Sequence, residues 1–202
     1  GDPCVEAVCN PGGACGEQAL ADGTVLAAQA PGDCKRRVRT GGAALDENDH
    51  DVVAVGHSLG SYALPWVADR RPLRHQVYLC GVVAEPGRTF AELNREQHIL
   101  NPAYPGGLAE VPGGTRWVDF DLAREIFYPD CDADVVAAAI PRLRVQARSP
   151  LTERCTFDRL PSVPVTYVVC AEDRMVDPAW SRRVATGRLG AELVELPGGH
   201  SP

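Results

Sequence analysis

The sequence predicts an α/β fold, with a mostly parallel sheet and flanking helices. Short apolar runs rich in β-branched residues, typical of buried strands, lie at 52–56, 76–83, 163–170 and 191–196. Segments with helical spacing lie between most of these runs, and parallel strands need such crossover connections. A Gly-x-Ser-x-Gly pattern stands where the first strand meets the first helix. Together these observations favour an α/β domain over an all-α or all-β one.

The composition bounds the class of protein. The chain has 202 residues, of which 45% are hydrophobic and 23% charged, as expected for one globular domain with a single core. A net charge of −7 and only a weak basic tract at 35–39 argue against a nucleic-acid partner. No apolar run is long enough to span a bilayer, and no export signal is visible. We therefore expect no membrane partner and a cytoplasmic location.

The first 42 residues differ from the rest. They are rich in Gly, Pro, Ala and Cys and show neither strand alternation nor helical periodicity. We expect residues 1–42 to be a disordered or non-homologous segment and residues 43–202 to form the domain.

The cysteines indicate neither a metal site nor a disulfide framework. Cys80 and Cys170 lie inside predicted strands and are expected to be small buried hydrophobic residues. The other six have no metal-type spacing: Cys4, Cys9, Cys15, Cys34, Cys131 and Cys155. Without an export signal, reduced thiols are expected. We predict no metal and no cofactor.

The pentad Gly56-His57-Ser58-Leu59-Gly60 carries the strongest functional signal. A Gly-x-Ser-x-Gly pentad between a strand and a helix, here 59–69, is typical of a nucleophile elbow, where a sharp turn exposes the serine hydroxyl. Ser58 is therefore the candidate nucleophile. Gly56 and Gly60 are expected because larger side chains there would collide as strand and helix close together.

A serine nucleophile needs a base and an acid that orients the base, and in such folds they follow in the order acid, then histidine. Three acids follow the strand at 163–170 and compete for the role: Glu172, Asp173 and Asp177. Asp173 is favoured because it falls in the loop just past the strand. Asp177 precedes Pro178, where an acid is expected to cap a helix.

The base is assigned among five histidines. His200 follows a strand and a Pro-Gly-Gly turn, which suits a loop that brings an imidazole close to another backbone. The other four are expected to be solvated surface residues: His50, His57, His75 and His98. The separation of Asp173 from His200 leaves room for one crossover helix at 177–190.

A long insertion, residues 84–160, separates the second and third predicted strands. Within it, 118–128 and 133–147 have helical spacing, the second bent by Pro141.

The chain resembles the α/β-hydrolases, and within them the branch of plant methylesterases, hydroxynitrile lyases and bacterial esterase-like relatives. The resemblance covers about residues 43–202 and rests on motifs in the order of that branch: GHSLGS, VYLCGVV, REIFYPDC, VVCAEDRMV and LPGGHSP. It implies that Ser58 is the nucleophile, Asp173 the orienting acid and His200 the general base. It also implies that the amide of Leu59 is one oxyanion donor.

In this family an insertion at this position forms a cap over the serine, so residues 84–160 are expected to select the substrate. Their apolar content suggests an uncharged acyl or alkyl group, and four aromatic residues are candidates to bind it: Trp117, Phe120, Phe127 and Tyr128. We expect Trp117→Ala and Tyr128→Ala to change ester preference more than melting temperature.

The chain departs from the family at both ends. Residues 1–50 lack the His-Gly that marks the second oxyanion donor, the strands expected before 52–56 are not visible, and no final helix follows His200. We expect an incomplete or frame-altered form of a longer hydrolase, weakly active and poorly stable, with an unpaired edge at 52–56 and one wet sheet face.

Two function classes remain. The first is a serine hydrolase of small uncharged carboxylic esters; the second is a catalytically impaired fragment or a non-catalytic small-molecule-binding relic. Cyanohydrin cleavage is less expected because Ser201 stands where the plant lyases have lysine. A dehalogenase would need aspartate in place of Ser58.

Overall fold

The structure is a computed structural model that describes residues 5–9, 15–19, 38–40, 43–45 and 51–202. The chain divides into two units, Gly1–His50 and Asp51–Pro202. In the first unit, β1 (Val5–Cys9) pairs antiparallel with β2 (Cys15–Ala19), and β3 (Val38–Thr40) with β4 (Ala43–Leu45). The remaining stretches of residues 1–42 lie outside the described residues, and the expectation for that segment stays a prediction.

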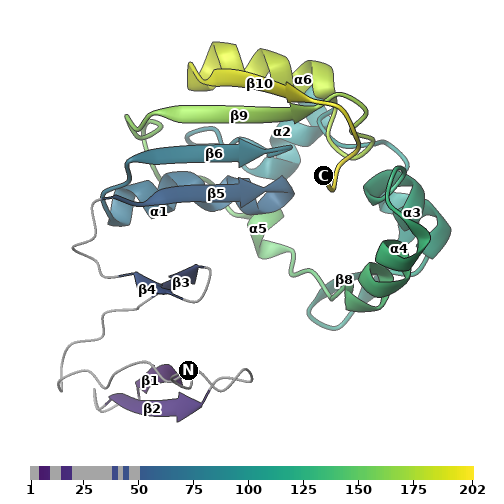
Figure 1. Cartoon of the computed structure of the whole chain (residues 1–202), viewed down its shortest axis with the longest axis horizontal. Helices are drawn as coiled ribbons and strands as arrows, with labels where there is room; N and C mark the ends of the chain where they lie inside the picture. Colours follow the sequence, from purple (N-terminus) through teal and green to yellow (C-terminus); the bar gives the residue numbers. More distant parts are fainter. Residues whose placement is uncertain (1–4, 10–14, 20–37, 41–42, 46–50) are drawn as a thin grey trace. The chain divides into compact units, whose positions relative to one another are not determined.

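The second unit is built on a parallel sheet. Its strands are β5 (Val53–His57), β6 (His75–Leu79), β9 (Val165–Cys170) and β10 (Glu192–Leu196). They lie side by side in the order β10-β9-β6-β5, and every pair is parallel (Figure 1). The α/β class with a mostly parallel sheet is confirmed, and β5, β9 and β10 lie close to their expected ranges. The strand expected at 76–83 is too long: β6 ends at Leu79, and Cys80 lies just beyond it with a left-handed φ of 44°.

Helices pack on one face of this sheet. They are the 3-10 turn Ser58–Ala63 with α1 (Leu64–Arg70), and α6 (Pro178–Val184) with the π turn Ala185–Leu189. Tyr78 and Tyr167 are neighbours in register on this face, and their rings stack with centroids 6.0 Å apart. The Tyr167 hydroxyl contacts Ser181 of α6 at 3.1 Å, and the Gln76 amide donates to the Leu64 carbonyl of α1 at 2.9 Å. Both helices are thus fixed to the sheet by buried polar contacts as well as apolar packing.

The other side of β5 faces solvent. Val53 and Val55 are 37% and 64% exposed, which is unusual for β-branched residues in a parallel sheet. Within the described residues β5 pairs only with β6 and forms the edge of the sheet. Both observations agree with the expected edge strand and wet sheet face.

Residues 84–160 form a set of short elements between β6 and β9, and α2 (Phe90–Gln97) packs into the same core as the sheet. The elements are α2, a 3-10 turn (Tyr104–Gly107), β7 (Leu108–Val111), β8 (Gly114–Trp117), α3 (Phe120–Phe127), α4 (Ala133–Ala139), a 3-10 turn (Ile140–Arg142) and α5 (Ser149–Thr152). Figure 1 shows α3, α4 and β8 gathered beyond the carboxyl ends of the strands. We refer to residues 84–160 as the insertion.

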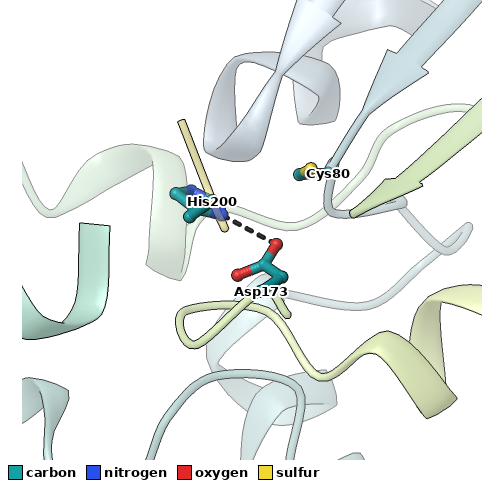
Figure 2. A group of neighbouring side chains, drawn as sticks. All are labelled: Cys80, Asp173 and His200. Carbon is teal, nitrogen blue, oxygen red and sulfur yellow. Dashed lines mark hydrogen bonds and ion pairs between the residues drawn. The ribbon is translucent and has the colours of Figure 1, made fainter. Parts of the chain in front are cut away.

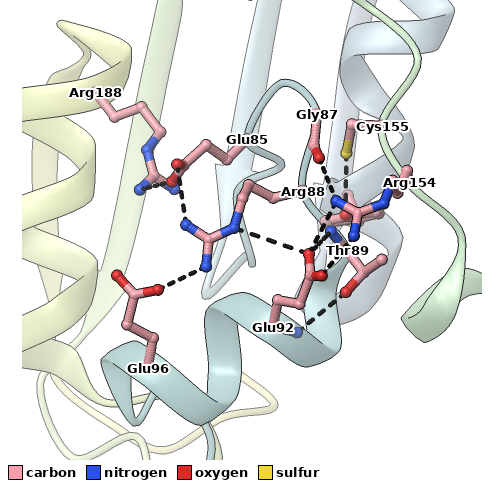
Figure 3. Close-up of polar contacts among 10 residues, drawn as sticks. Glu85, Gly87, Arg88, Thr89, Glu92, Glu96, Arg154, Cys155 and Arg188 are labelled. Atoms are coloured by element: carbon pink, nitrogen blue, oxygen red, sulfur yellow. Dashed lines mark hydrogen bonds and ion pairs between the residues drawn. The ribbon is translucent and has the colours of Figure 1, made fainter.

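A polar network joins the two ends of the insertion (Figure 3). Arg88, near its start, forms ion pairs with Glu85, Glu92 and Glu96. Arg154, near its end, pairs with Glu92 at 2.7 Å. The backbone amide of Thr89 and, after it, the Arg154 guanidinium hold the pKa of Glu92 below its usual value. Because Glu92 pairs with an arginine near each end of the insertion, these ion pairs hold the two ends of the insertion close together.

None of the helices in the part of the chain that the structure describes is long and apolar enough to cross a bilayer.

Candidate active site

Ser58 occupies a sharp turn directly after β5. Its φ of 52° is left-handed, a strained conformation for a residue with a side chain. A Cβ at Gly56 would lie 2.5 Å from the Cα of Ser61, so glycine is required there, as expected. The same reason fails for Gly60, where a Cβ would meet nothing within 4 Å among the described residues. The collision expected at Gly60 is therefore wrong, because this residue is exposed and a side chain would point into open space.

Asp173 and His200 lie in the loops that follow β9 and β10. Oδ1 of Asp173 accepts hydrogen bonds from the amides of Met175 at 2.7 Å and Val176 at 2.9 Å, which fixes the carboxylate. Asp173 is 8% exposed and His200 1% exposed. Buried polar groups of this kind need partners, and each is the partner of the other.

The three predicted side chains meet in one hydrogen-bonded chain. His200 Nδ1 lies 2.9 Å from Asp173 Oδ2 (Figure 2), and His200 Nε2 lies 2.8 Å from Ser58 Oγ. A carboxylate only accepts, so Nδ1 carries the proton and Nε2 of the neutral ring accepts from the serine hydroxyl. This tautomer allows the imidazole to take the serine proton.

The two competing acids have other partners. Glu172 accepts a hydrogen bond from the Gly198 amide. Asp177 caps α6 by accepting from the amides of Ala179 and Trp180 at 2.9 Å and 3.2 Å, so its predicted capping role is confirmed.

The other histidines differ in their surroundings. His75 contacts the Thr166 hydroxyl at 2.8 Å, and His98 ends α2 with a φ of 52°. His50 lies outside the described residues. His57 is exposed, as expected, but its Nε2 also donates to the His200 carbonyl at 2.7 Å, and partial burial of the ring lowers its pKa. It thus holds the backbone of the residue that bonds Ser58, a contact that no local pattern indicates.

Cys80 lies beside this chain (Figure 2). Ligand atoms of Cys80, Asp173 and His200 lie within 4.8 Å of one another, close enough to suggest a metal site. Asp173 and His200 are, however, bonded to each other, and burial raises the pKa of the Cys80 thiol, which disfavours the thiolate that a metal would need. Cys80 and Cys170 are 1% and 0% exposed, which confirms them as buried.

The four aromatic candidates for substrate binding differ in how deeply they are buried. Trp117 is 7% exposed, and its ring meets Phe127 edge-on at 5.2 Å between centroids. Phe127 in turn lies 5.7 Å from the His200 ring and 5.9 Å from the ring of Tyr128. Trp117 and Phe127 line a cavity of about 360 Å³. Phe120 is 49% exposed.

Leu59, the candidate oxyanion donor, follows Ser58 and is half-buried. Its side chain lines a second cavity of about 360 Å³ with Tyr62 and Trp66. Leu59 directly follows Ser58 in the sequence, so one wall of this cavity is formed by the residue next to the candidate nucleophile.

Comparison with known proteins agrees with the observed fold. A model of the alpha/beta hydrolase family matches residues 15–202. The chain belongs to the alpha/beta hydrolase family. The match begins at residue 15, whereas the resemblance seen in the sequence began near residue 43.

Named relatives of this alpha/beta hydrolase are hydrolases and esterases. The chain is 26% identical over 171 residues to the alpha/beta hydrolase nvfD of Aspergillus novofumigatus, covering 78% of this chain and 66% of that protein. Among solved structures it is similar to a pyrethroid hydrolase from Sphingobium faniae JZ-2, at 20% identity and a TM-score of 0.60, covering 76% of this chain and 65% of that one. It is also similar to a methylesterase from Arabidopsis, at 21% identity and a TM-score of 0.54, with 76% and 63% covered. The chain thus spans just under two thirds of these relatives.

Proposed function

We propose that the chain hydrolyses small carboxylic esters through Ser58 as nucleophile, His200 as general base and Asp173 as the acid that orients the base. One observation carries the proposal: the continuous hydrogen-bonded chain from Ser58 Oγ through His200 to Asp173. The names of its structural neighbours, a pyrethroid hydrolase and a methylesterase, support esters as the substrate class.

The mechanism follows from the direction of these hydrogen bonds. His200 Nε2 accepts the Ser58 proton as Oγ attacks the ester carbonyl and forms a tetrahedral intermediate. The imidazolium is stabilised by Asp173, whose other oxygen is held by two backbone amides. It then gives the proton to the leaving alcohol, and an acyl-enzyme remains on Ser58. Water, activated by His200, releases the acid and restores the serine.

The oxyanion needs donors that are in place before the reaction. We assign one to the amide of Leu59, because the amide after the nucleophile supplies this contact in folds of this type. A single donor of this kind contributes about a hundredfold or more in rate.

We assign the role of a cap to the insertion. Phe127 lies 5.7 Å from the His200 ring and, with Trp117, lines the cavity of about 360 Å³, so we place an apolar part of the ester there. Tyr128 packs beside Phe127, and the half-exposed Phe120 is assigned to the same cap. The preference for an uncharged group belongs to this proposal, although Arg142 and Arg144 line the same cavity.

Steady-state hydrolysis of p-nitrophenyl butyrate tests the proposal. Ser58→Ala and His200→Ala should each lower kcat by about 10⁴-fold or more, whereas His75→Ala, a matched histidine on the same sheet, should leave it unchanged. Turnover that survives in Ser58→Ala would overturn the assignment. In the same assay, a preference for a matched ester whose acyl chain ends in a carboxylate would overturn only the proposal that the substrate is uncharged.

A folded wild-type chain without Ser58-dependent turnover would favour the second class, a non-catalytic binding relic of the same fold. The cytoplasmic location expected from the sequence also remains part of the proposal, and cell fractionation tests it.

A further inference from the structure

The loop that carries His200 is held by side chains from outside it. The amide of Gly199 donates to Asp130 Oδ2 at 2.7 Å. Asp130 belongs to the insertion, in the short link between α3 and α4. A carboxylate from the insertion therefore binds the peptide unit next to the residue assigned as the general base.

The link and the loop are in close contact. A Cβ at Gly199 would lie 2.7 Å from Asp130 Oδ1 and 2.8 Å from the Cγ of Pro129. One at Gly198, whose φ is +103°, would lie 2.9 Å from Asp130 Oδ2. The Cys131 thiol lies 3.7 Å from the Ser201 carbonyl. The two glycines thus leave just enough room for this segment of the insertion to lie against the loop.

The same glycines make the loop dependent on outside support. Glycine has the largest conformational freedom of any residue, so Gly198 and Gly199 do not by themselves fix the direction of the backbone into His200. The contact of His200 Nε2 with Ser58 Oγ is nevertheless a single 2.8 Å hydrogen bond. Misplacement of a reacting group by about 1 Å is enough to cost about a hundredfold in rate.

We propose that Asp130 is a positioning residue for His200: its carboxylate holds the Gly199 amide, so the insertion places the base together with Asp173 and His57. The inference rests on the proposed function and extends it, because it makes the insertion part of the catalytic geometry as well as a source of substrate contacts. Asp130 touches neither Ser58 nor the His200 ring in this role and acts only through the backbone.

Hydrogen bonding and charge are separable at this position. Asparagine keeps an acceptor oxygen at nearly the same place and removes the charge, whereas alanine removes both. Asp132 provides a matched control, because it is an exposed acid two residues away whose side chain caps no amide.

The first measurement is the kinetics of ester hydrolysis by the full chain. Asp130→Ala should lower kcat by about 10- to 100-fold with little change in KM, Asp130→Asn should recover most of that loss, and Asp132→Ala should match the wild type. An unchanged kcat in Asp130→Ala overturns the proposal. A kcat in Asp130→Asn as low as in Asp130→Ala overturns the role of the acceptor.

The second measurement does not depend on activity. Hydrogen–deuterium exchange of the peptide that contains Gly199 should be faster in Asp130→Ala than in the wild type and unchanged in Asp132→Ala. Exchange equal to the wild type in Asp130→Ala overturns the anchor even if the wild-type chain proves to be inactive, so failure of this inference is distinguishable from failure of the proposed function. Faster exchange with unchanged kcat overturns the link to the base.

Discussion

At the scale of single residues, the site depends on hydrogen bonds to the backbone as much as on contacts between side chains. Asp173 is fixed by two amides, the Gly199 amide by Asp130, and the His200 carbonyl by His57. Each contact restricts the position of a group that sets the distance between Ser58 Oγ and His200 Nε2. Serine and histidine alone would not keep a 2.8 Å contact in loops that contain glycine.

His57 links this geometry to pH. Burial lowers its pKa in the folded chain below the value of 6.5 expected when unfolded, so the unfolded state binds more protons in the interval between the two values. The contribution of neutral His57 to the free energy of unfolding is therefore complete above pH 6.5. It is lost as the pH falls from 6.5 through the lower pKa of the folded state. The variant His57→Gln keeps a donor for the His200 carbonyl but does not titrate.

We therefore predict that acidification from about pH 7.5 to about pH 5.5 lowers the free energy of unfolding more in the wild type than in His57→Gln. Urea denaturation at the two pH values measures the difference. Equal losses in both proteins would show that His57 is not the titrating group.

At the scale of elements, the buried residues of the insertion belong to the same hydrophobic core as the sheet. Trp117 at the end of β8 is buried between Tyr104 and Phe127 and lies against Gly107, where a Cβ would meet its ring at 2.3 Å. Packing this close indicates that Trp117 stabilises the insertion. The expectation that its removal changes mainly ester preference is therefore revised for Trp117 and retained for the half-buried Tyr128.

We predict that Trp117→Ala lowers the free energy of unfolding by about 3 kcal/mol or more, as for other buried aromatic residues, with a smaller loss for Tyr128→Ala. Urea denaturation of both variants, together with their relative rates on a short and a long acyl ester, measures the two effects. A Trp117→Ala variant as stable as the wild type, with altered ester preference, would restore the original expectation.

The elements also mark what the sequence predicts well. Three of the four strands and the helix at 118–128 are found close to their expected ranges because their apolar periodicity is strong, whereas β6 ends at Leu79 and not at residue 83. The helix expected at 133–147 ends at Ala139, since Pro141 cannot continue the hydrogen-bond ladder. The β7–β8 hairpin was not expected, because its short strands lack clear alternation around the turn at Gly113.

At the scale of the whole molecule, the parallel sheet assembles the site. The carboxyl ends of β5, β9 and β10 meet at one edge, so residues 58 and 200, which are 142 positions apart, lie in hydrogen-bond contact. Sequence order and motif spacing were sufficient to find Ser58, Asp173 and His200. They could not find Asp130 or His57, whose partners are backbone groups 69 and 143 residues away that leave no residue-type signal.

The account depends on an activated hydroxyl at Ser58, and mass spectrometry after reaction with a fluorophosphonate probe tests this most directly. We predict one adduct, on Ser58, in the wild type, no adduct in Ser58→Ala, and much slower labelling in His200→Ala because the base is absent. A folded wild-type chain that is not labelled, or that is labelled at a residue other than Ser58, would contradict the account.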